Sequence, residues 1–177
     1  MIEAFETGKD VHCLTAGLIF GIPPDAVSDD EGSCPIGGGA YSQRFWGKKA
    51  NHGLNYDLGY KTFALYYEIP ENEAKYIVER YHSAYPEVRQ WHTVLRGQLS
   101  KNRTLTDCFG STRLFTDRWG DELFKEAYSW IPQSSVAKQT NYRGVLPLYY
   151  QLEPFGPVRL LNQVHDAVYI RSEEHTS

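Results

Sequence analysis

The chain has 177 residues, of which 41% are hydrophobic and 23% charged, and its net charge is −4 at pH 7. That length fits one domain or two very small ones with a real core, and the composition excludes a disordered tail and a membrane protein. The acidic balance excludes a uniformly basic nucleic-acid coat protein but leaves room for a local basic surface.

The first part of the chain is predicted to be helical with one long loop. Residues 2–20 read as a helix interrupted by Gly8 and Gly17, and residues 21–39, rich in Gly and Pro, read as a loop. A second helix is expected from about Tyr41 to Tyr56. After Gly59 the apolar pattern resumes.

The later elements change from helix to strand. Pro70 and Pro86 each open a helix, because proline is favoured in the first helical turn. Residues 104–116 read as a hairpin around a Gly-Ser turn, and residues 121–142 as a helix broken near Pro132. Residues 158–170 read as strand with a turn at 165–166. Because helices dominate and strands come late, the fold class is α+β.

The cysteines and the N-terminal residues indicate the cellular compartment in which the protein is expected. The three cysteines are far apart and form no zinc-binding pattern, which favours reduced thiols inside a cell. Residues 1–20 contain no apolar signal-peptide core, and no apolar run is long enough to span a membrane. We therefore expect a cytoplasmic location and no membrane partner.

Charge is unevenly distributed along the chain. Residues 1–40 have one lysine against seven acids, and residues 41–118 have twelve basic against eight acidic residues, which gives net charges of −6 and +4. This unevenness fits either ordinary variation or a basic working face flanked by an acidic scaffold.

The most informative segment is YSQRFWGKKANHGLNYDLG, residues 41–59. Arg44, Lys48, His52 and Tyr56 recur every four residues, so a helix would place them along one stripe. Two cations one turn apart repel each other unless an anion joins them, and a polyphosphate is such an anion. A ring further along could stack on a base or ribose. The alternative is a solvated helix face with Tyr56 in the core.

Two further segments could carry chemistry. In LLNQVHDAV, residues 160–168, a tight turn between apolar strands presents Asp166, either as ordinary turn chemistry or as a carboxylate for a hard divalent cation. In AYSWIPQSSVA, residues 127–137, Gln133 follows a proline and could donate to minor-groove acceptors, unless the segment is only a kinked core helix.

Together and in this order, these segments resemble DNA polymerase family A, the group of bacterial DNA polymerase I and many phage replicases. RFWGKKANHGLNYD resembles the fingers helix of motif B, NQVHDAV resembles motif C, and IPQSSVA is similar to the family's primer–template segment. IEAFETGKDVHCLTAGLIFG, YHSAYPEVRQW and NRTLTDCFGSTRLF look like the intervening segments. The match covers about residues 2–170, and it is poorest at 22–40.

The resemblance implies a role for each matching residue. Arg44 and Lys48 would bind the triphosphate of the incoming dNTP, and Lys48 would also stabilise or protonate the leaving pyrophosphate. His52 stands where the family usually has Phe or Tyr, which bears on sugar discrimination, and Tyr56 would lie beside the nascent base pair. Asp57 departs from the usual glycine. Asp166 would be a catalytic ligand of Mg²⁺, and the residues implied in primer–template contact are Arg113, Gln133, Gln163 and His165.

The reaction implied is template-directed transfer of a nucleotide to a primer 3′-hydroxyl, with primer–template DNA and dNTP as partners and two Mg²⁺ ions as cofactor. The expected divisions are a palm-to-fingers connection (1–40), fingers (41–102) and palm (103–170). The family's motif A aspartate has no counterpart here, so we expect a fragment that is inactive alone, and residues 171–177 resemble a translated sequencing adapter. The alternatives are a non-catalytic nucleotide- or nucleic-acid-binding module and, less favoured, a relative of single-subunit RNA polymerases.

Overall fold

A computed structural model describes residues 2–151, 158–164 and 167–172. The helices are α1 (Ile2–Glu6), α2 (Val11–Phe20), α3 (Gln43–Leu54), α4 (Tyr60–Tyr67), α5 (Glu71–Ala84), α6 (Pro86–Asn102), α7 (Asp121–Thr140) and α8 (Leu146–Gln151), with a π-helical segment, η3 (Asn141–Val145), between the last two. Two short 3-10 turns, η1 (Pro24–Ala26) and η2 (Ile36–Gly39), lie in the predicted loop. The strands are β1 (Thr104–Thr106), β2 (Thr112–Leu114), β3 (Val158–Val164) and β4 (Ala167–Ser172).

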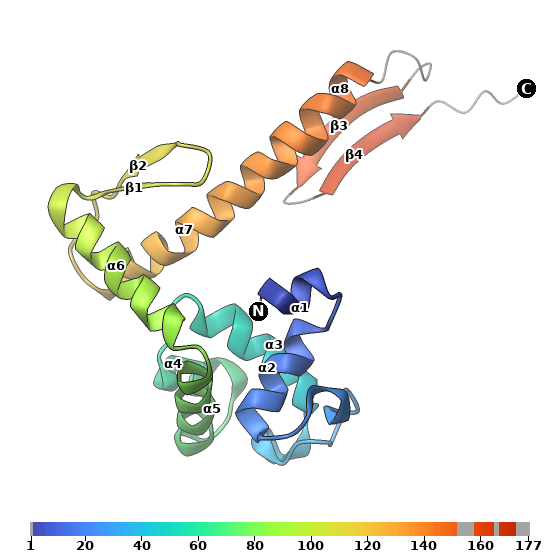
Figure 1. Ribbon diagram of the computed structural model, residues 1–177, viewed down its shortest axis with the longest axis vertical. Coiled ribbons are helices and arrows are strands. Elements are labelled where there is room, and N and C mark those ends of the chain that lie inside the picture. The colour runs from blue at the N-terminus through green and yellow to red at the C-terminus, as the bar shows by residue number, and fades with distance from the viewer. Residues whose placement is uncertain (1, 152–157, 165–166, 173–177) are drawn as a thin grey trace, which may run out of the picture.

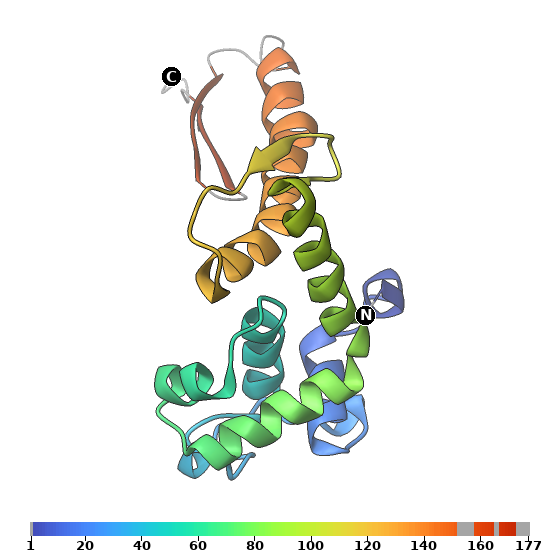
Figure 2. The same cartoon turned by 90° about the vertical axis from the view of Figure 1, so that its left-hand side faces the viewer.

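The helices and the hairpins form two regions joined by one helix. In Figure 1, α1 to α5 gather at one end and α7, α8 and the β3–β4 hairpin extend at the other, with α6 running between them. Figure 2 gives the same arrangement from the side. Helices with two small antiparallel sheets confirm the predicted α+β class. Within the described residues, no helix is long and apolar enough to cross a membrane.

The first region has its own core. Trp46, Ala50 and Leu54 of α3 are fully buried, and their spacing of four residues places them on one face of the helix. They pack with Ile77 and Tyr81 of α5, which are also fully buried. Burial of this apolar area fixes α3 against α2 and α5, and it leaves the opposite face of α3 toward solvent.

A second core lies where α6 meets the β1–β2 hairpin and α7. Leu99, Leu105 and Phe115 meet Leu123 and Tyr128 there, and each is at most 2% exposed. The two cores contain different residues, and α6 connects them, since it starts beside α5 and ends beside β1. Tyr56, from the turn after α3, also packs against the second core and adds a further contact between the two regions.

Both predicted hairpins are confirmed. Leu105 pairs with Arg113 in the first, and Gly110 takes the left-handed φ of 82° that its turn requires. In the second, Val164 pairs with Ala167, so the predicted turn falls between them. The turn residues 165 and 166 lie outside the described part of the chain.

Of the three predicted helix interruptions, the one at Gly8 is confirmed and those at Gly17 and Pro132 are not. Residues 2–20 form two helices, because Gly8 has a φ of 68° and Asp10 caps α2, accepting from the backbone N–H groups of residues 12 and 13. Gly17 does not interrupt α2. The helix predicted from 41 to 56 spans Gln43–Leu54. Pro132 does not break α7, which continues to Thr140, because the second core holds its first turns in place.

Candidate nucleotide and DNA interface

The helix α3 carries the central residues of the predicted site. Its N-cap is Ser42, whose hydroxyl accepts a hydrogen bond from the backbone N–H of Phe45 at 3.0 Å. Trp46, Ala50 and Leu54 form the buried face of α3. A residue two positions before or after one of them lies about 200° around the helix axis and therefore points to the opposite side. The structure accordingly leaves Lys48 and His52 exposed and Arg44 half-buried. We call these three residues the basic face.

His12 of α2 adjoins the basic face. Its ring centroid lies 5.9 Å from that of His52, and the two planes are tilted by 32°. Burial lowers the pKa of His12 below its usual value, and the charges of Arg44, His52 and Lys48 lower it further, while Asp10 raises it. The net effect favours the neutral imidazole of His12, which lies among the basic groups of Arg44 and Lys48 and the carboxylate of Asp10.

Arg44 is already engaged by two carboxylates. Its Nη2 lies 2.8 Å from Asp10 Oδ2 and its Nη1 lies 3.6 Å from Asp29 Oδ2. Burial alone would raise the pKa of Asp10, but hydrogen bonds from Arg44 and from the N–H groups of His12 and Cys13 hold it below its usual value. The same hydrogen bond from Arg44 raises the pKa of its guanidinium. A polyphosphate at Arg44 has to compete with this pairing, whereas Lys48 makes no ion pair within the described residues.

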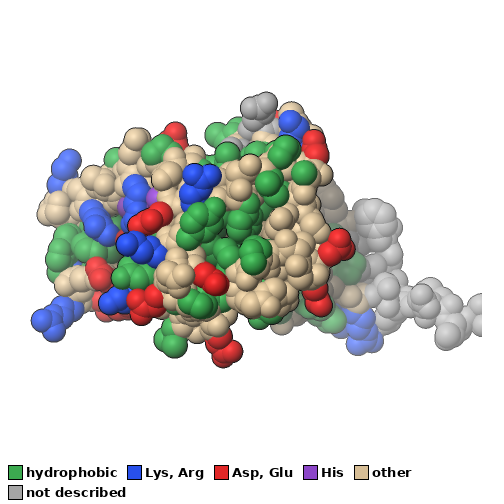
Figure 3. Space-filling view, turned by 90° about the horizontal axis from the view of Figure 1, so that it is seen from below, with side chains coloured by type: hydrophobic (Ala, Val, Ile, Leu, Met, Phe, Trp, Pro, Cys, Tyr) green, Lys and Arg blue, Asp and Glu red, His purple; other side chains and the backbone are tan. Residues whose placement is uncertain are grey.

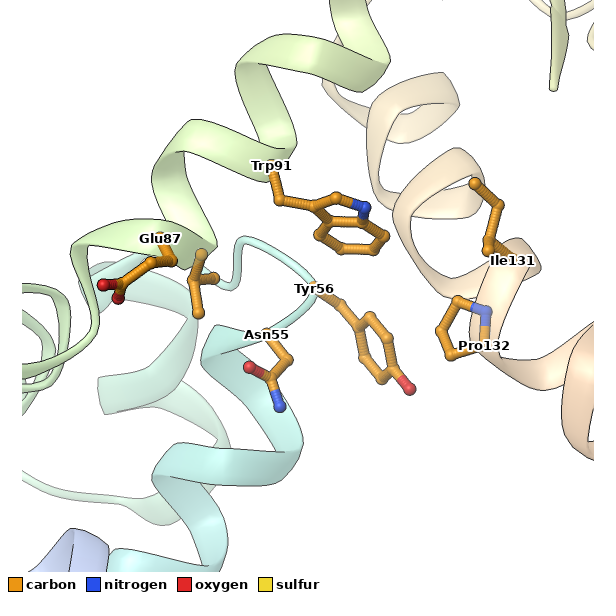
Figure 4. A pocket seen from close by; sticks show the side chains of 7 residues that line it. Asn55, Tyr56, Glu87, Trp91, Ile131 and Pro132 are labelled. Atoms are coloured by element: carbon orange, nitrogen blue, oxygen red, sulfur yellow. The ribbon is translucent and has the colours of Figure 1, made fainter. Parts of the chain in front are cut away.

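Tyr56 leaves the predicted stripe. It lies two residues beyond the end of α3, in a turn where its N–H bonds to Gly53 O at 3.1 Å. Its ring enters a pocket of about 400 Å³ between the turn, α6 and α7. In Figure 4 the rings of Tyr56 and Trp91 point toward Ile131 and Pro132, and the Glu87 carboxylate points away. The helical-stripe prediction thus holds for three of its four residues.

His52 and Tyr56 nevertheless meet at a second pocket. This pocket, of about 370 Å³, is lined by both rings together with Lys125 and Glu126 of α7. Glu126 is paired with Arg113 of β2, whose guanidinium also stacks 5.0 Å from the Phe115 ring centroid. The predicted DNA contact Arg113 therefore lies near the predicted nucleotide residues, although its charge is already neutralised by a neighbour.

Gln133 is exposed on α7, one residue after Pro132. The β1–β2 hairpin is docked to the following turn of α7 by Asp107, whose side chain is fully buried and bonds to Lys138 and, at 2.6 Å, to Ser134 Oγ. Burial alone would raise the pKa of Asp107, but these bonds and two backbone N–H groups hold it well below its usual range. The hairpin thus fixes the helix segment that presents Gln133.

The remaining predicted residues lie at the far hairpin. Gln163 is half-buried on β3, opposite Val168 of β4. His165 and Asp166 fall outside the described residues. In the described ranges, no group of three or more His, Cys, Asp or Glu side chains is placed to hold a metal ion.

Sequence reasoning missed His12 and Asn51. His12 is separated from the basic face by more than thirty residues, and only the packing of α2 against α3 brings it there. Asn51 is 8% exposed and bonds to His12, Thr15 and Val11 O. A polar residue at a position facing the core was the one available signal for Asn51.

Known proteins resemble this chain over nearly its whole length. The family model described as DNA polymerase family A matches residues 1–177. The thermostable DNA polymerase I of Thermus thermophilus is 27% identical over 179 residues, which is 98% of this chain and 20% of that protein. DNA polymerase I of Helicobacter pylori is also 27% identical, over 98% of this chain and 18% of that protein.

A solved structure is similar over nearly the whole chain. The POL domain of Pol1 from M. smegmatis, in complex with DNA primer-template and dNTP, superposes with a TM-score of 0.77 and 25% identity. The match covers 98% of this chain and 30% of that one. The chain thus spans about a fifth of the length of the curated relatives it matches.

Proposed function

The chain belongs to DNA polymerase family A, and from that premise we propose that it provides the nucleotide-binding fingers and part of the palm of a DNA-directed DNA polymerase. The full protein would transfer a nucleotide from dNTP to a primer 3′-hydroxyl during DNA replication in the cytoplasm of a bacterial or phage-infected cell. In this proposal residues 1–40 connect palm to fingers, 41–102 are fingers and 103–170 are palm. The observation that carries it is the basic face of α3, with His12 beside it.

The basic face would bind the triphosphate. Arg44 and Lys48 supply two cations one helical turn apart, and a chain of phosphates removes their mutual repulsion. Lys48, exposed and without an ion pair in the described part of the chain, is the group that would stabilise or protonate the leaving pyrophosphate. The Arg44–Asp10 pairing would be exchanged for a phosphate contact when the nucleotide arrives.

His52 and Tyr56 would contact the sugar and base. Support comes from the pocket that both rings line opposite α7, because a pocket with two flat rings suits a stacked base. Histidine is smaller than the usual Phe or Tyr and can ionise, so we propose that His52 alters the choice between sugars. Tyr56 would lie beside the nascent base pair.

Primer–template DNA would run along α7 and the two hairpins. Arg113 suits a phosphate contact and the exposed Gln133 a minor-groove contact. Gln163 and His165 are proposed on the same surface, the latter outside the described residues. We also propose Asp166 as the residue for Mg²⁺, an ion that would neutralise phosphate charge when bound, although the described residues offer no set of carboxylates with it.

Nucleotide binding by the 177-residue chain tests the proposal. A fluorescent dNTP is titrated into wild type, Lys48→Ala and Arg44→Ala. Because a charge-assisted hydrogen bond is worth about 1.5–3 kcal/mol, we expect Lys48→Ala to raise Kd at least about tenfold. Arg44→Ala should lose less, since the wild-type arginine must first leave Asp10 and Asp29.

Lys49→Ala is the matched control. Lys49 is the next residue on α3, but its Nζ lies over the rings of Phe45 and Tyr67, 5.0 and 5.5 Å from their centroids. It therefore belongs to another face, and its removal should leave the Kd for dNTP unchanged. Equal losses in Lys48→Ala and Lys49→Ala, or no loss in either, would contradict a triphosphate site on the basic face.

A further inference from the structure

Two side chains of α6 each contact the turn after α3 on one side and α7 on the other. They are His92 and Arg96, which are one helical turn apart and therefore lie on the same face of α6. The turn comprises residues 55–57, and we call it the Tyr56 turn. Since α3 carries the basic face and α7 carries Gln133, these two side chains stand between the two proposed binding surfaces.

His92 joins the backbone of the Tyr56 turn to the second core. Its Nε2 lies 2.8 Å from the backbone oxygen of Asn55 and, because a carbonyl can only accept, Nε2 carries the proton. Its ring stacks on the ring of Tyr128 of α7, with centroids 4.1 Å apart and planes inclined by 21°. Both residues are buried. Displacement of the turn from α7 would break one of these two contacts.

Arg96 makes the same connection through its charge. Its Nη2 lies 2.9 Å from Asp57 Oδ2, and its Nε donates a hydrogen bond to the Tyr128 hydroxyl. The guanidinium also lies over the rings of Phe124 and Tyr128, 4.8 and 5.8 Å from their centroids. A guanidinium holds its donors in a rigid planar fork, so it can serve the carboxylate and the hydroxyl at once. Arg96 therefore bridges Asp57 and Tyr128.

The Tyr56 turn is also the place where the two cores meet. Asn55 Oδ1 accepts a hydrogen bond at 2.7 Å from the hydroxyl of Tyr81, a residue of the first core. The next residue, Tyr56, packs against the second core. Because the turn directly follows Leu54, a shift of the turn relative to α7 also shifts the end of α3 that carries His52. The contacts that hold the turn therefore set the position of α3 relative to α7.

We propose that His92 and Arg96 are positioning residues that hold the Tyr56 turn on Tyr128 and thereby couple the binding of dNTP at α3 to the binding of primer–template DNA along α7. The identity of the two ligands rests on the proposed function. The link from Asp57 through Arg96 to Tyr128 does not, because its contacts exist without either ligand. The link and the coupling can therefore be measured separately.

The link is measured first, in the ligand-free chain. Asp57→Asn and Tyr128→Phe each remove a group that contacts Arg96, and within the described residues no hydrogen bond joins Asp57 to Tyr128 directly. In the wild-type background, we expect the double variant to differ at least about twofold in its equilibrium constant of unfolding from the product of the two single effects. In the Arg96→Ala background the two substitutions should act independently. Urea unfolding of the eight chains gives both results.

The coupling is measured next, as the ratio of the Kd for a fluorescent dNTP without and with a saturating primer–template duplex. A primer that lacks its 3′-hydroxyl keeps any transfer from starting. In wild type we expect the duplex to lower the Kd at least about fivefold. In Arg96→Ala the ratio should fall below about twofold, because α3 is then free to bind dNTP independently of α7. A residue that only stabilised the fold would leave this ratio unchanged.

Arg89→Ala is the matched control. Arg89 lies two turns before Arg96 on α6 and pairs with the other carboxylate oxygen of Asp57. In the described part of the chain it makes no hydrogen bond or ion pair with α7. Arg89→Ala should therefore lose an ion pair of the same kind and keep the wild-type ratio. Arg96→Lys keeps a charge for Asp57 but lacks the fork that reaches Tyr128, so its ratio should fall.

Two variants separate the contacts of His92. His92→Phe keeps a ring against Tyr128 but leaves the backbone oxygen of Asn55 without its donor. His92→Gln keeps a donor for that oxygen but removes the stacked ring. Each should reduce the ratio, and Arg96→Ala, whose side chain is about half exposed, keeps the result interpretable if either variant of the buried His92 folds poorly.

Non-additivity of Asp57→Asn and Tyr128→Phe that is absent in wild type, or that persists in Arg96→Ala, would overturn the link. Equal ratios in Arg96→Ala and Arg89→Ala, or a wild-type Kd for dNTP that does not respond to the duplex, would overturn the coupling. If wild type binds no dNTP at all, the proposed function fails and the coupling with it, whereas the unfolding measurements still decide the link through Arg96.

Discussion

Asp57 holds an unusual backbone position directly after Tyr56. Its φ of 62° is left-handed, a conformation that glycine adopts freely and that Asp and Asn tolerate better than most other residues. Its two carboxylate oxygens pair with Arg89 and, at 2.9 Å, with Arg96, both on α6. Asp57, at a position where the family resemblance implies glycine, thus has a left-handed conformation and links the Tyr56 turn to α6 through its ion pairs.

Asp57→Asn should show how much the ion pairs of Asp57 contribute to the free energy of unfolding, without disturbing the backbone. Asn tolerates the same φ but carries no charge, so only the ion pairs are lost. Because both arginines are about half exposed, we expect the free energy of unfolding to fall by only about 1 kcal/mol, and by less at 1 M salt. Urea unfolding at low and high salt checks this.

Glu68→Gln provides the control for this variant. Glu68 also has a left-handed φ, of 52°, and it is exposed with no ion pair in the described ranges. Its stability should not change at either salt concentration. A loss in Asp57→Asn that is the same at low and high salt would argue against the ion pairs.

The contact between α2 and α3 depends on Gly47. A Cβ built at this position would lie 2.2 Å from His12 O and 2.8 Å from Ala16 N, distances that no side chain can occupy. The glycine therefore lets the two helix backbones approach closely. This approach brings His12 to the basic face and Asn51 to Thr15.

Gly47→Ala should separate α2 from α3. We expect a loss of about 3 kcal/mol in the free energy of unfolding and a weaker affinity for dNTP, because His12 moves with α2. Gly97→Ala on α6 is the control, since a Cβ there meets nothing within 4 Å. It should stabilise the chain by up to about 1 kcal/mol. Urea unfolding gives the free energy of unfolding of both variants. Equal values for Gly47→Ala and Gly97→Ala would contradict the close approach of the α2 and α3 backbones.

At the scale of the whole molecule, acidic side chains lie among the basic ones. Figure 3 views the end at which α1 to α5 gather, where Lys and Arg are interspersed with Asp and Glu around hydrophobic side chains. Several arginines of the net-positive stretch 41–118 are paired with acids, namely Arg44, Arg89, Arg96 and Arg113. The positive charge of this stretch is thus partly offset by local ion pairs.

The C-terminal arm, which comprises η3, α8, β3 and β4, exposes several large hydrophobic side chains. Its large exposed hydrophobic side chains are Tyr142, Leu146, Tyr149, Tyr150, Leu161, Val164, Tyr169 and Ile170. Scattered exposed hydrophobic residues are ordinary, but a continuous patch marks a surface suited to contact with another protein segment. The curated relatives, of which this chain spans about a fifth, have further chain that could provide one.

We expect the 177-residue chain to bind a hydrophobic dye such as ANS through this arm. The triple variant Tyr149→Ser, Tyr150→Ser and Ile170→Ser should reduce the dye fluorescence by more than half. Tyr66→Ser is the control, because Tyr66 is similarly exposed, at 68%, but lies on α4. Dye binding that is absent in wild type, or reduced equally by both variants, would contradict an apolar binding surface on the arm.

The sequence by itself determined the elements whose signals are local. Periodicity of apolar residues, prolines at helix starts and a Gly-Ser turn predicted α3, α5, α6 and both hairpins, and the spacing of Arg44, Lys48 and His52 predicted the basic face. Ordered motifs indicated the family that the comparisons show. The elements and the basic face depend on residues close together in the sequence, whereas the family is indicated by the order of motifs along the chain.

Only the tertiary structure decided which residues complete the site. Because α3 ends at Leu54, the Tyr56 ring points into a pocket that Trp91 also lines. The continuity of α7 across Pro132 depended on the second core. Most decisively, His12 reached the basic face because Gly47 lets α2 and α3 touch. Contacts of this kind join residues more than thirty positions apart, and packing rather than local spacing sets them.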